Sequence, residues 1–111
     1  MQGDAVVLAL HGEVDLHAAP ELRERLATTI DGDASAVLVD LSDVTFLDST
    51  ALGVLVGAMK RLRATRKPLR LVAPRPDIRR LLEITLLDRV LGIDATTEDA
   101  LAAVAPGSGR F

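Results

Sequence analysis

One short run in the middle of the chain limits the possible folds more than any other feature. The run Ala36–Val39 is apolar at every position, whereas a strand with one solvated face alternates between apolar and polar residues. It therefore predicts a central strand that is covered on both faces, as in the parallel sheets of α/β proteins. The chain has 111 residues, which is room for one ordinary domain.

Extended and helical patterns alternate along the rest of the chain. We expect further strands at Ala5–Leu10, which Gly12 ends, at Leu69–Val72 and at Leu91–Ile93. Between them, apolar residues recur at helical spacing: Leu22, Leu26 and Ile30; Leu52, Leu55, Met59 and Leu62; Ile78, Leu81 and Leu82; Leu101 and Val104. This order predicts an α/β domain with a mostly parallel sheet of about four strands, flanked by about four helices and joined by right-handed crossovers.

Several residues mark helix ends and the limits of the domain. Pro20 suits the first turn of the first helix, and Gly32 is a candidate left-handed cap at its end. Thr96 with Asp99 three residues later approximates a capping box for the last helix. We expect the domain to cover residues 1–105, followed by a flexible tail over residues 106–111, which is rich in glycine and contains proline.

The composition excludes several classes of protein. The chain has no cysteine, so it can contain no disulfide, thiolate zinc site or cysteine nucleophile. Its longest apolar runs are far shorter than a membrane span, and no basic segment leads into an apolar one near Met1. We therefore expect a cytoplasmic protein that does not enter a membrane. The net charge of −3, from 13 basic and 16 acidic residues, is ordinary for a protein in solution.

Nine of the thirteen basic residues fall between Lys60 and Arg80. Nucleic acid is a poor candidate for their partner, because Phe46 and Phe111 are the only aromatic residues on which bases could stack. A solvated face of helices and a loop explains the stretch best. An acidic patch on a partner protein is the second interpretation.

Catalytic signatures are missing from the sequence. It contains no Walker-type or dinucleotide-binding glycine loop and no nucleophile elbow. His11 and His17 flank a turn, but no carboxylate at ligand spacing accompanies them. Aspartates that could act as acid or base also occur at strand ends and turns for local hydrogen-bonding reasons: Asp15, Asp40, Asp43 and Asp48. We therefore expect a protein that is not an enzyme and that uses no cofactor or metal.

The most informative segment runs from Val37 to Leu55. A buried strand leads into a loop and then into a helix that begins at Asp48-Ser49-Thr50. Asp48 or Ser49 can accept a hydrogen bond from the free N–H groups of the first helical turn. Considered without its context, the triplet is explained by helix capping alone.

In context, the stretch Asp40–Gly53, D-L-S-D-V-T-F-L-D-S-T-A-L-G, resembles the phosphorylatable motif of the anti-sigma factor antagonists. These are members of the STAS domain family (sulphate transporter and anti-sigma factor antagonist). Gly12–Asp15 matches a second element of that family, and Leu69–Pro74 leading into Arg79–Leu82 matches a third. The segment Leu87–Val90 is also similar, so the resemblance covers nearly the whole chain in the right order.

The resemblance implies a function. The unphosphorylated form would bind an anti-sigma factor that is also a serine kinase and so free a sigma factor, and phosphorylation of Ser49 would end that binding. Asp15 would lie near Ser49 and assist binding or transfer, and Asp48 would hold the helix start. Thr50 and Gly53 complete the implied partner-binding set, and a serine phosphatase would reset the switch. A helix N-terminus also favours an anion on physical grounds.

Two features differ from the common family pattern, and a third allows two explanations. Only four residues precede Ala5, where many relatives have an extra strand, so one sheet edge would be exposed and would allow a weak homodimer. Ala51 replaces the commoner glycine. Gly53 and Gly57 lie four apart on one helix face, where they permit close approach by a partner or by the protein's own sheet.

Two alternative functions remain open. A STAS domain also serves as an unphosphorylated scaffold or as a subunit of a transporter complex. A two-component receiver would accept phosphate on Asp40, and Lys67-Pro68 superficially resembles the lysine of receivers. Receivers need an acidic pair after the first strand to hold magnesium, however, and Leu10-His11-Gly12 stands there instead.

Overall fold

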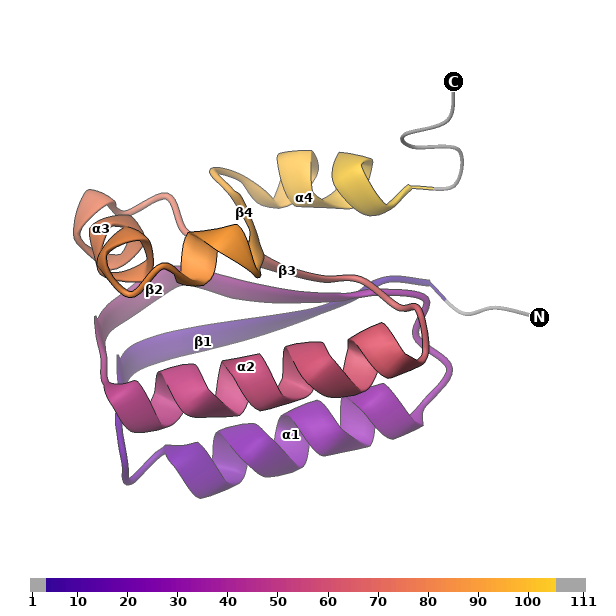
Figure 1. Cartoon of the computed structure of the whole chain (residues 1–111), viewed down its shortest axis with the longest axis horizontal. Helices are drawn as coiled ribbons and strands as arrows, with labels where there is room; N and C mark the ends of the chain where they lie inside the picture. Colours follow the sequence, from indigo (N-terminus) through magenta and orange to yellow (C-terminus); the bar gives the residue numbers. More distant parts are fainter. Residues whose placement is uncertain (1–3, 106–111) are drawn as a thin grey trace.

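The computed structural model describes residues 4–105, and its sheet has four parallel strands (Figure 1). They are β1 (Val6–Val14), β2 (Val37–Leu47), β3 (Leu69–Val72) and β4 (Gly92–Asp94), in that spatial order. β2 lies between β1 and β3, and Val37, Leu38 and Val39 are completely buried. The run of apolar residues therefore forms an interior strand, as its sequence predicts.

Helices cover both faces of the sheet. They are α1 (Ala19–Asp31), α2 (Ser49–Ala64), α3 (Pro76–Ile84), the short 3₁₀ helix η1 (Leu87–Arg89) and α4 (Thr97–Val104). α1 and α2 run side by side along one face, and α4 lies on the opposite side of the sheet (Figure 1). Within the described residues, four α-helices and four parallel strands confirm the expected α/β architecture.

The core has two parts of unequal size. The larger lies between the sheet and the α1–α2 layer, where Leu26, Leu41 and Leu55 are almost fully buried. The smaller lies beneath α4, where Leu38 of β2 packs near Ala100. Leu38 and Val39 thus point to opposite faces of one strand, which explains why both must be apolar. Leu101, expected on the apolar face of the last helix, is largely exposed, and Ala100 is the buried residue there.

Two strands are longer than the sequence predicts. β1 continues through Gly12 to Val14, because Gly12 adopts a positive φ of +70° and its pairing with β2 shifts register on either side. Such a bulge absorbs a residue without ending the ladder. β2 continues to Leu47, so the loop expected between this strand and the following helix is absent. Its polar positions pair with β1 instead, for example Asp43 opposite His11.

The helix ends confirm some predictions and correct one. Pro20 lies in the first turn of α1, and Thr96 Oγ1 accepts a hydrogen bond from the Asp99 N–H, at 3.0 Å. Gly32, however, is extended, with φ −80° and ψ −163°, and is not a left-handed cap. Its N–H donates to the Thr29 carbonyl, which closes α1 with a tighter turn and without a positive φ.

β1 forms one edge of the sheet within residues 4–105, since β2 is the only strand with which it pairs there. The side chain of Val7 on this strand is largely exposed. No helix in the same residue range is long and apolar enough to span a bilayer. The expected tail, residues 106–111, lies outside the residues that the structure describes.

Candidate functional site

The candidate site lies where β1 and β2 end and α2 begins, and the Asp48 carboxylate is at its centre. Asp48 Oδ1 accepts a hydrogen bond from the Ala51 N–H at 3.0 Å, which is the geometry of a helix N-cap. Asp48 Oδ2 accepts a second one, from the Leu16 N–H at 2.8 Å. One carboxylate therefore joins the start of α2 to the loop between β1 and α1, although the residues are far apart in sequence.

The loop on the other side of this contact is ordered by Asp15. Asp15 Oδ1 accepts hydrogen bonds from the N–H groups of His17 at 3.0 Å and Ala18 at 3.2 Å. The residues on either side of Asp15 both bond to Asp48. The Leu16 N–H donates to the Asp48 carboxylate, and the Asp48 N–H donates to the Val14 carbonyl at 3.4 Å. The structure thus brings the Asp15 loop and the start of α2 together, although the sequence separates them by a whole helix and strand.

Ser49 is the first residue of α2, and its side chain is exposed. Its hydroxyl takes part in none of the hydrogen bonds found among residues 4–105. Because Asp48 caps the helix, capping does not account for the hydroxyl of Ser49, and this decides between the two cap candidates. The remaining members of the predicted set lie around it: Asp15, Asp48 and Thr50 are half-buried and Gly53 is exposed.

The electrostatics of this helix start are mixed. The first turn of α2 contains no acidic residue, so the positive end of the helix dipole is offset only by the cap itself. An anion on the Ser49 oxygen would be stabilised by that dipole and by the N–H groups of the first turn. The same anion would lie next to the Asp48 carboxylate, which repels it. The site can therefore carry a phosphate, at the cost of concentrated negative charge.

Two exposed apolar residues flank this start of α2, and sequence reasoning did not single them out. Leu16 is 60% exposed and Phe46 is 49% exposed. Leu16 donates its N–H to Asp48, and Phe46 precedes Asp48 by two residues on β2. The position of Phe46 inside the recognised motif was a usable signal. Leu16 gave none, because the turn expected between His11 and His17 does not by itself show which of its side chains is exposed.

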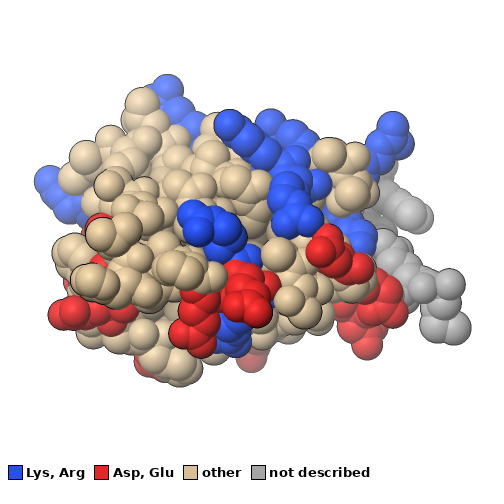
Figure 2. Space-filling view, turned by 90° about the horizontal axis from the view of Figure 1, so that it is seen from below, with Lys and Arg blue, Asp and Glu red and all other residues tan. Residues whose placement is uncertain are grey.

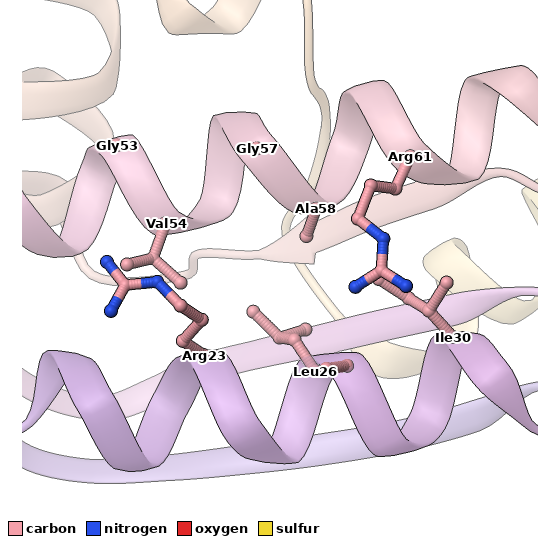
Figure 3. A pocket seen from close by; sticks show the side chains of 9 residues that line it. Arg23, Leu26, Ile30, Gly53, Val54, Gly57, Ala58 and Arg61 are labelled. Carbon is pink, nitrogen blue, oxygen red and sulfur yellow. The ribbon is translucent and has the colours of Figure 1, made fainter.

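A groove of about 250 Å³ runs between α1 and α2, beyond Ser49 along the same helix (Figure 3). Gly53 and Gly57 form part of its α2 side, and Arg23 and Arg61 project over it. A Cβ atom added at either glycine would meet no atom within 4 Å. Packing against the protein's own sheet therefore does not explain the two glycines.

The other polar groups weighed in the sequence have local roles. His11 Nδ1 lies 3.3 Å from Asp43 Oδ2, and both side chains are about 70% exposed. Asp40 accepts hydrogen bonds from the Ser42 N–H and from the Ser42 hydroxyl. Residues 4–105 contain no group of three or more histidine or acidic side chains that could hold a metal ion. Asp40 thus has a local hydrogen-bond partner, and within the described residues it belongs to no acidic group of the size that a receiver needs.

Comparison with known proteins identifies the family. The sequence model of the STAS domain matches residues 1–100. The chain belongs to the STAS domain family. Among its relatives, the anti-sigma-B factor antagonist of Listeria monocytogenes is 36% identical over 90 residues, which cover 81% of this chain and 79% of that protein. The family resemblance seen in the motifs is thereby confirmed.

Solved structures of STAS domains share the fold of this chain. An anti-sigma factor antagonist from Mycobacterium paratuberculosis has a TM-score of 0.84 and 32% identity, covering 90% of this chain and 85% of that one. SpoIIAA, an anti-sigma factor antagonist and Bacillus cell fate determinant, has been solved in unphosphorylated and phosphorylated forms. Each form has a TM-score of 0.70 and 29% identity; the phosphorylated form covers 91% of either chain, and the unphosphorylated form 90% of this chain and 88% of its own.

Proposed function

We propose that this STAS domain is an anti-sigma factor antagonist that is switched by phosphorylation of Ser49. Its unphosphorylated form binds an anti-sigma factor, which is also a serine kinase, and thereby frees a sigma factor. The observation that carries the proposal is the exposed Ser49 hydroxyl, which lies at the start of α2 beside the Asp48 cap and makes no hydrogen bond within residues 4–105. The relatives support it, because one of them is known in both phosphorylation states.

Ser49 is a better phosphate acceptor than its neighbour Thr50. The Ser49 side chain is exposed, whereas Thr50 is half-buried one step into the helix. A kinase must reach the hydroxyl from outside, and the serine oxygen on its unbranched side chain is the more accessible. Phosphate at this position also meets the helix N-terminus, so the fold tolerates it.

The switch acts at the binding surface. Phosphorylation adds about −1.5 to −2 charges at neutral pH. These charges appear beside Asp48 and close to the Asp15 loop, on a surface that must lose water when a partner binds. Repulsion and desolvation together oppose the complex. A loss of about 3 kcal/mol corresponds to more than a hundredfold in affinity, which is enough for an on/off response.

The binding surface extends from this site along α2. Leu16 and Phe46 supply exposed apolar contacts, and the groove at Gly53 allows a partner to approach the helix backbone closely. A serine phosphatase resets the switch by removing the phosphate. Because sigma factors act on RNA polymerase inside the cell, we place the protein in the cytoplasm, where it works by binding and not by catalysis.

A pull-down with two forms of the protein tests the proposal. One bait carries phosphoserine at position 49, introduced during synthesis, and the other is unmodified; both are exposed to lysate of the source cells. We expect the unmodified bait to recover an ATP-binding anti-sigma factor, and that protein with ATP to phosphorylate the bait once, on Ser49. Ser49→Ala should bind the factor and accept no phosphate.

Several outcomes would contradict the proposal. Transporter subunits recovered in place of an anti-sigma factor would favour the scaffold alternative. Efficient labelling of Ser49→Ala at Thr50, or acid-labile phosphate on Asp40, would overturn the assignment of the acceptor. Equal recovery by both baits would leave Ser49 without a switching role.

A further inference from the structure

The end of α2 that is remote from Ser49 carries a second distinctive surface. Arg63, Arg66 and Lys67, here called the basic cluster, line a shallow cavity of about 450 Å³. The cavity is completed by Met59, Pro68, Leu69 and Val90. Figure 2 views the molecule from the side of α1 and α2, and Lys and Arg side chains gather toward its upper right, apart from most acidic ones. An α-helix rises 1.5 Å per residue, so Arg63 lies about 21 Å along α2 from Ser49.

The cations of this cluster lack the partners that nearby arginines have. Three other arginines of the same stretch form ion pairs: Arg61 with Asp31, Arg70 with Asp94 and Arg75 with Asp77. Within residues 4–105, the basic cluster forms none, and Lys67 Nζ only donates to the Gly32 carbonyl at 3.5 Å. No acidic residue occurs between Ser49 and Pro76, in a chain whose net charge is −3. Within the described residues, these positive charges are thus close together and form no ion pair.

The backbone at Arg66 adds an independent observation. Arg66 has a φ of +62°, and its N–H donates to the Arg63 carbonyl at 3.0 Å, just after the end of α2. Glycine is the usual residue at such a left-handed position after a helix, because other L-residues are strained there. Arginine therefore weakens the helix end that it terminates. Its side chain is exposed, so no apolar packing inside the molecule compensates for the strain.

The cavity beside the cluster favours one kind of ligand. Met59 and Leu69 are buried at its apolar floor, and Val90, 45% exposed, stands at its side. A recessed apolar floor suits an inserted side chain better than the flat surface of a bilayer. Among residues 4–105, no aromatic side chain lines the cavity, so this part of the chain offers no stacking platform for nucleic-acid bases. Three cations around an apolar floor match carboxylates on either side of an apolar group.

We propose that the basic cluster and its cavity bind an acidic segment of a partner protein, in which carboxylate side chains flank an apolar one. The site is separate from the Ser49 surface and does not depend on phosphorylation there. One partner long enough to follow α2 would occupy both surfaces, and two partners would each occupy one. Arg66 then has a function that accounts for its strained backbone.

Peptide binding to the full chain tests this proposal. The probe is fluorescein-labelled Glu-Glu-Leu-Glu-Glu, and its uncharged counterpart is Gln-Gln-Leu-Gln-Gln, both measured at physiological ionic strength. We expect only the acidic peptide to bind and the amide signals of Met59, Leu69 and Val90 to shift in NMR spectra. The triple variant Arg63→Gln, Arg66→Gln, Lys67→Gln should bind about tenfold more weakly or worse. The matched control Arg75→Gln should bind normally, because Arg75 is already paired with Asp77.

Arg66→Gly separates binding from folding. It should raise the melting temperature by about 4 °C, since glycine relieves the left-handed strain, and it should still weaken peptide binding. Normal binding by Arg66→Gly would remove Arg66 from the site and overturn the proposal. Equal weakening by Arg75→Gln, or equal binding of the uncharged peptide, would also overturn it. The proposal would also be overturned if the protein bound phosphatidylserine vesicles or an oligonucleotide in a charge-dependent way but did not bind the acidic peptide.

Discussion

Asp48→Ala removes two hydrogen-bond acceptors at once, one from each oxygen of the carboxylate. Loss of the N-cap to the Ala51 N–H costs about 1 kcal/mol. Loss of the contact with the Leu16 N–H, which is solvent-accessible, costs about 1 kcal/mol more. The free energy of unfolding should therefore fall by about 2 kcal/mol. For a chain of this size, that change lowers the melting temperature by about 8 °C.

Two further variants make the measurement specific. Asp48→Asn keeps one acceptor oxygen and remains a good helix cap, so it should lose only about 1 kcal/mol. Ser49→Ala changes the adjacent residue, whose hydroxyl does not cap the helix, and should change stability by less than about 0.5 kcal/mol. Urea unfolding followed by circular dichroism gives all three values. Equal destabilisation by Ser49→Ala and Asp48→Ala would refute the assignment of Asp48 as the cap.

Three other predictions concern the core, the switch and the groove. Val39→Asp places an unpartnered charge at a fully buried position, and the cost is comparable to the total stability of about 5–15 kcal/mol. Circular dichroism should therefore show a largely unfolded chain. Melting at the wild-type temperature would contradict the position of β2. Phosphoserine at position 49 should weaken binding of the purified anti-sigma factor about a hundredfold in titration calorimetry, with an unchanged circular dichroism spectrum. Gly57→Ala should stabilise the isolated domain by about 0.5–1 kcal/mol, since the added Cβ meets no neighbour. The same variant should weaken binding of the anti-sigma factor. Unchanged affinity would exclude the groove from the interface.

The parts of the fold that sequence predicts are those set by local pattern. Leu38 and Val39 point to opposite faces of β2, and both faces are buried. Both residues must therefore be apolar, which produces the unbroken apolar run in the sequence. Leu22, Leu26 and Ile30 show the period of a helix with one buried face, as α1 has. Ser49 and Asp48 were recognisable because their motif is specific. In each case the information lies within one element and its immediate flanks.

What sequence could not predict depends on contacts between distant segments. The polar residues Ser42, Asp43 and Thr45 predict a loop. In the structure this segment belongs to β2, because β1 pairs with it as far as Leu47. The second acceptor role of Asp48 was hidden because its partner is a backbone N–H, which every non-proline residue has. Gly53 and Gly57 indicated close approach to one face of α2, but the groove itself could not be predicted, since it arises only when α1 and α2 pack together.

The direct passage from β2 into α2 has a consequence for how Ser49 can be recognised. Ser49 lies two residues beyond the end of a paired strand and inside a capped helix, so it is not part of a segment that can be drawn out freely. An enzyme that reads its substrates as extended peptides would have to melt the first turn of α2 and break the Asp48 contacts. If Ser49 is the phosphate acceptor, as proposed, its kinase has to recognise the folded start of α2. Under that proposal, kinases that bind extended peptides would leave Ser49 unmodified.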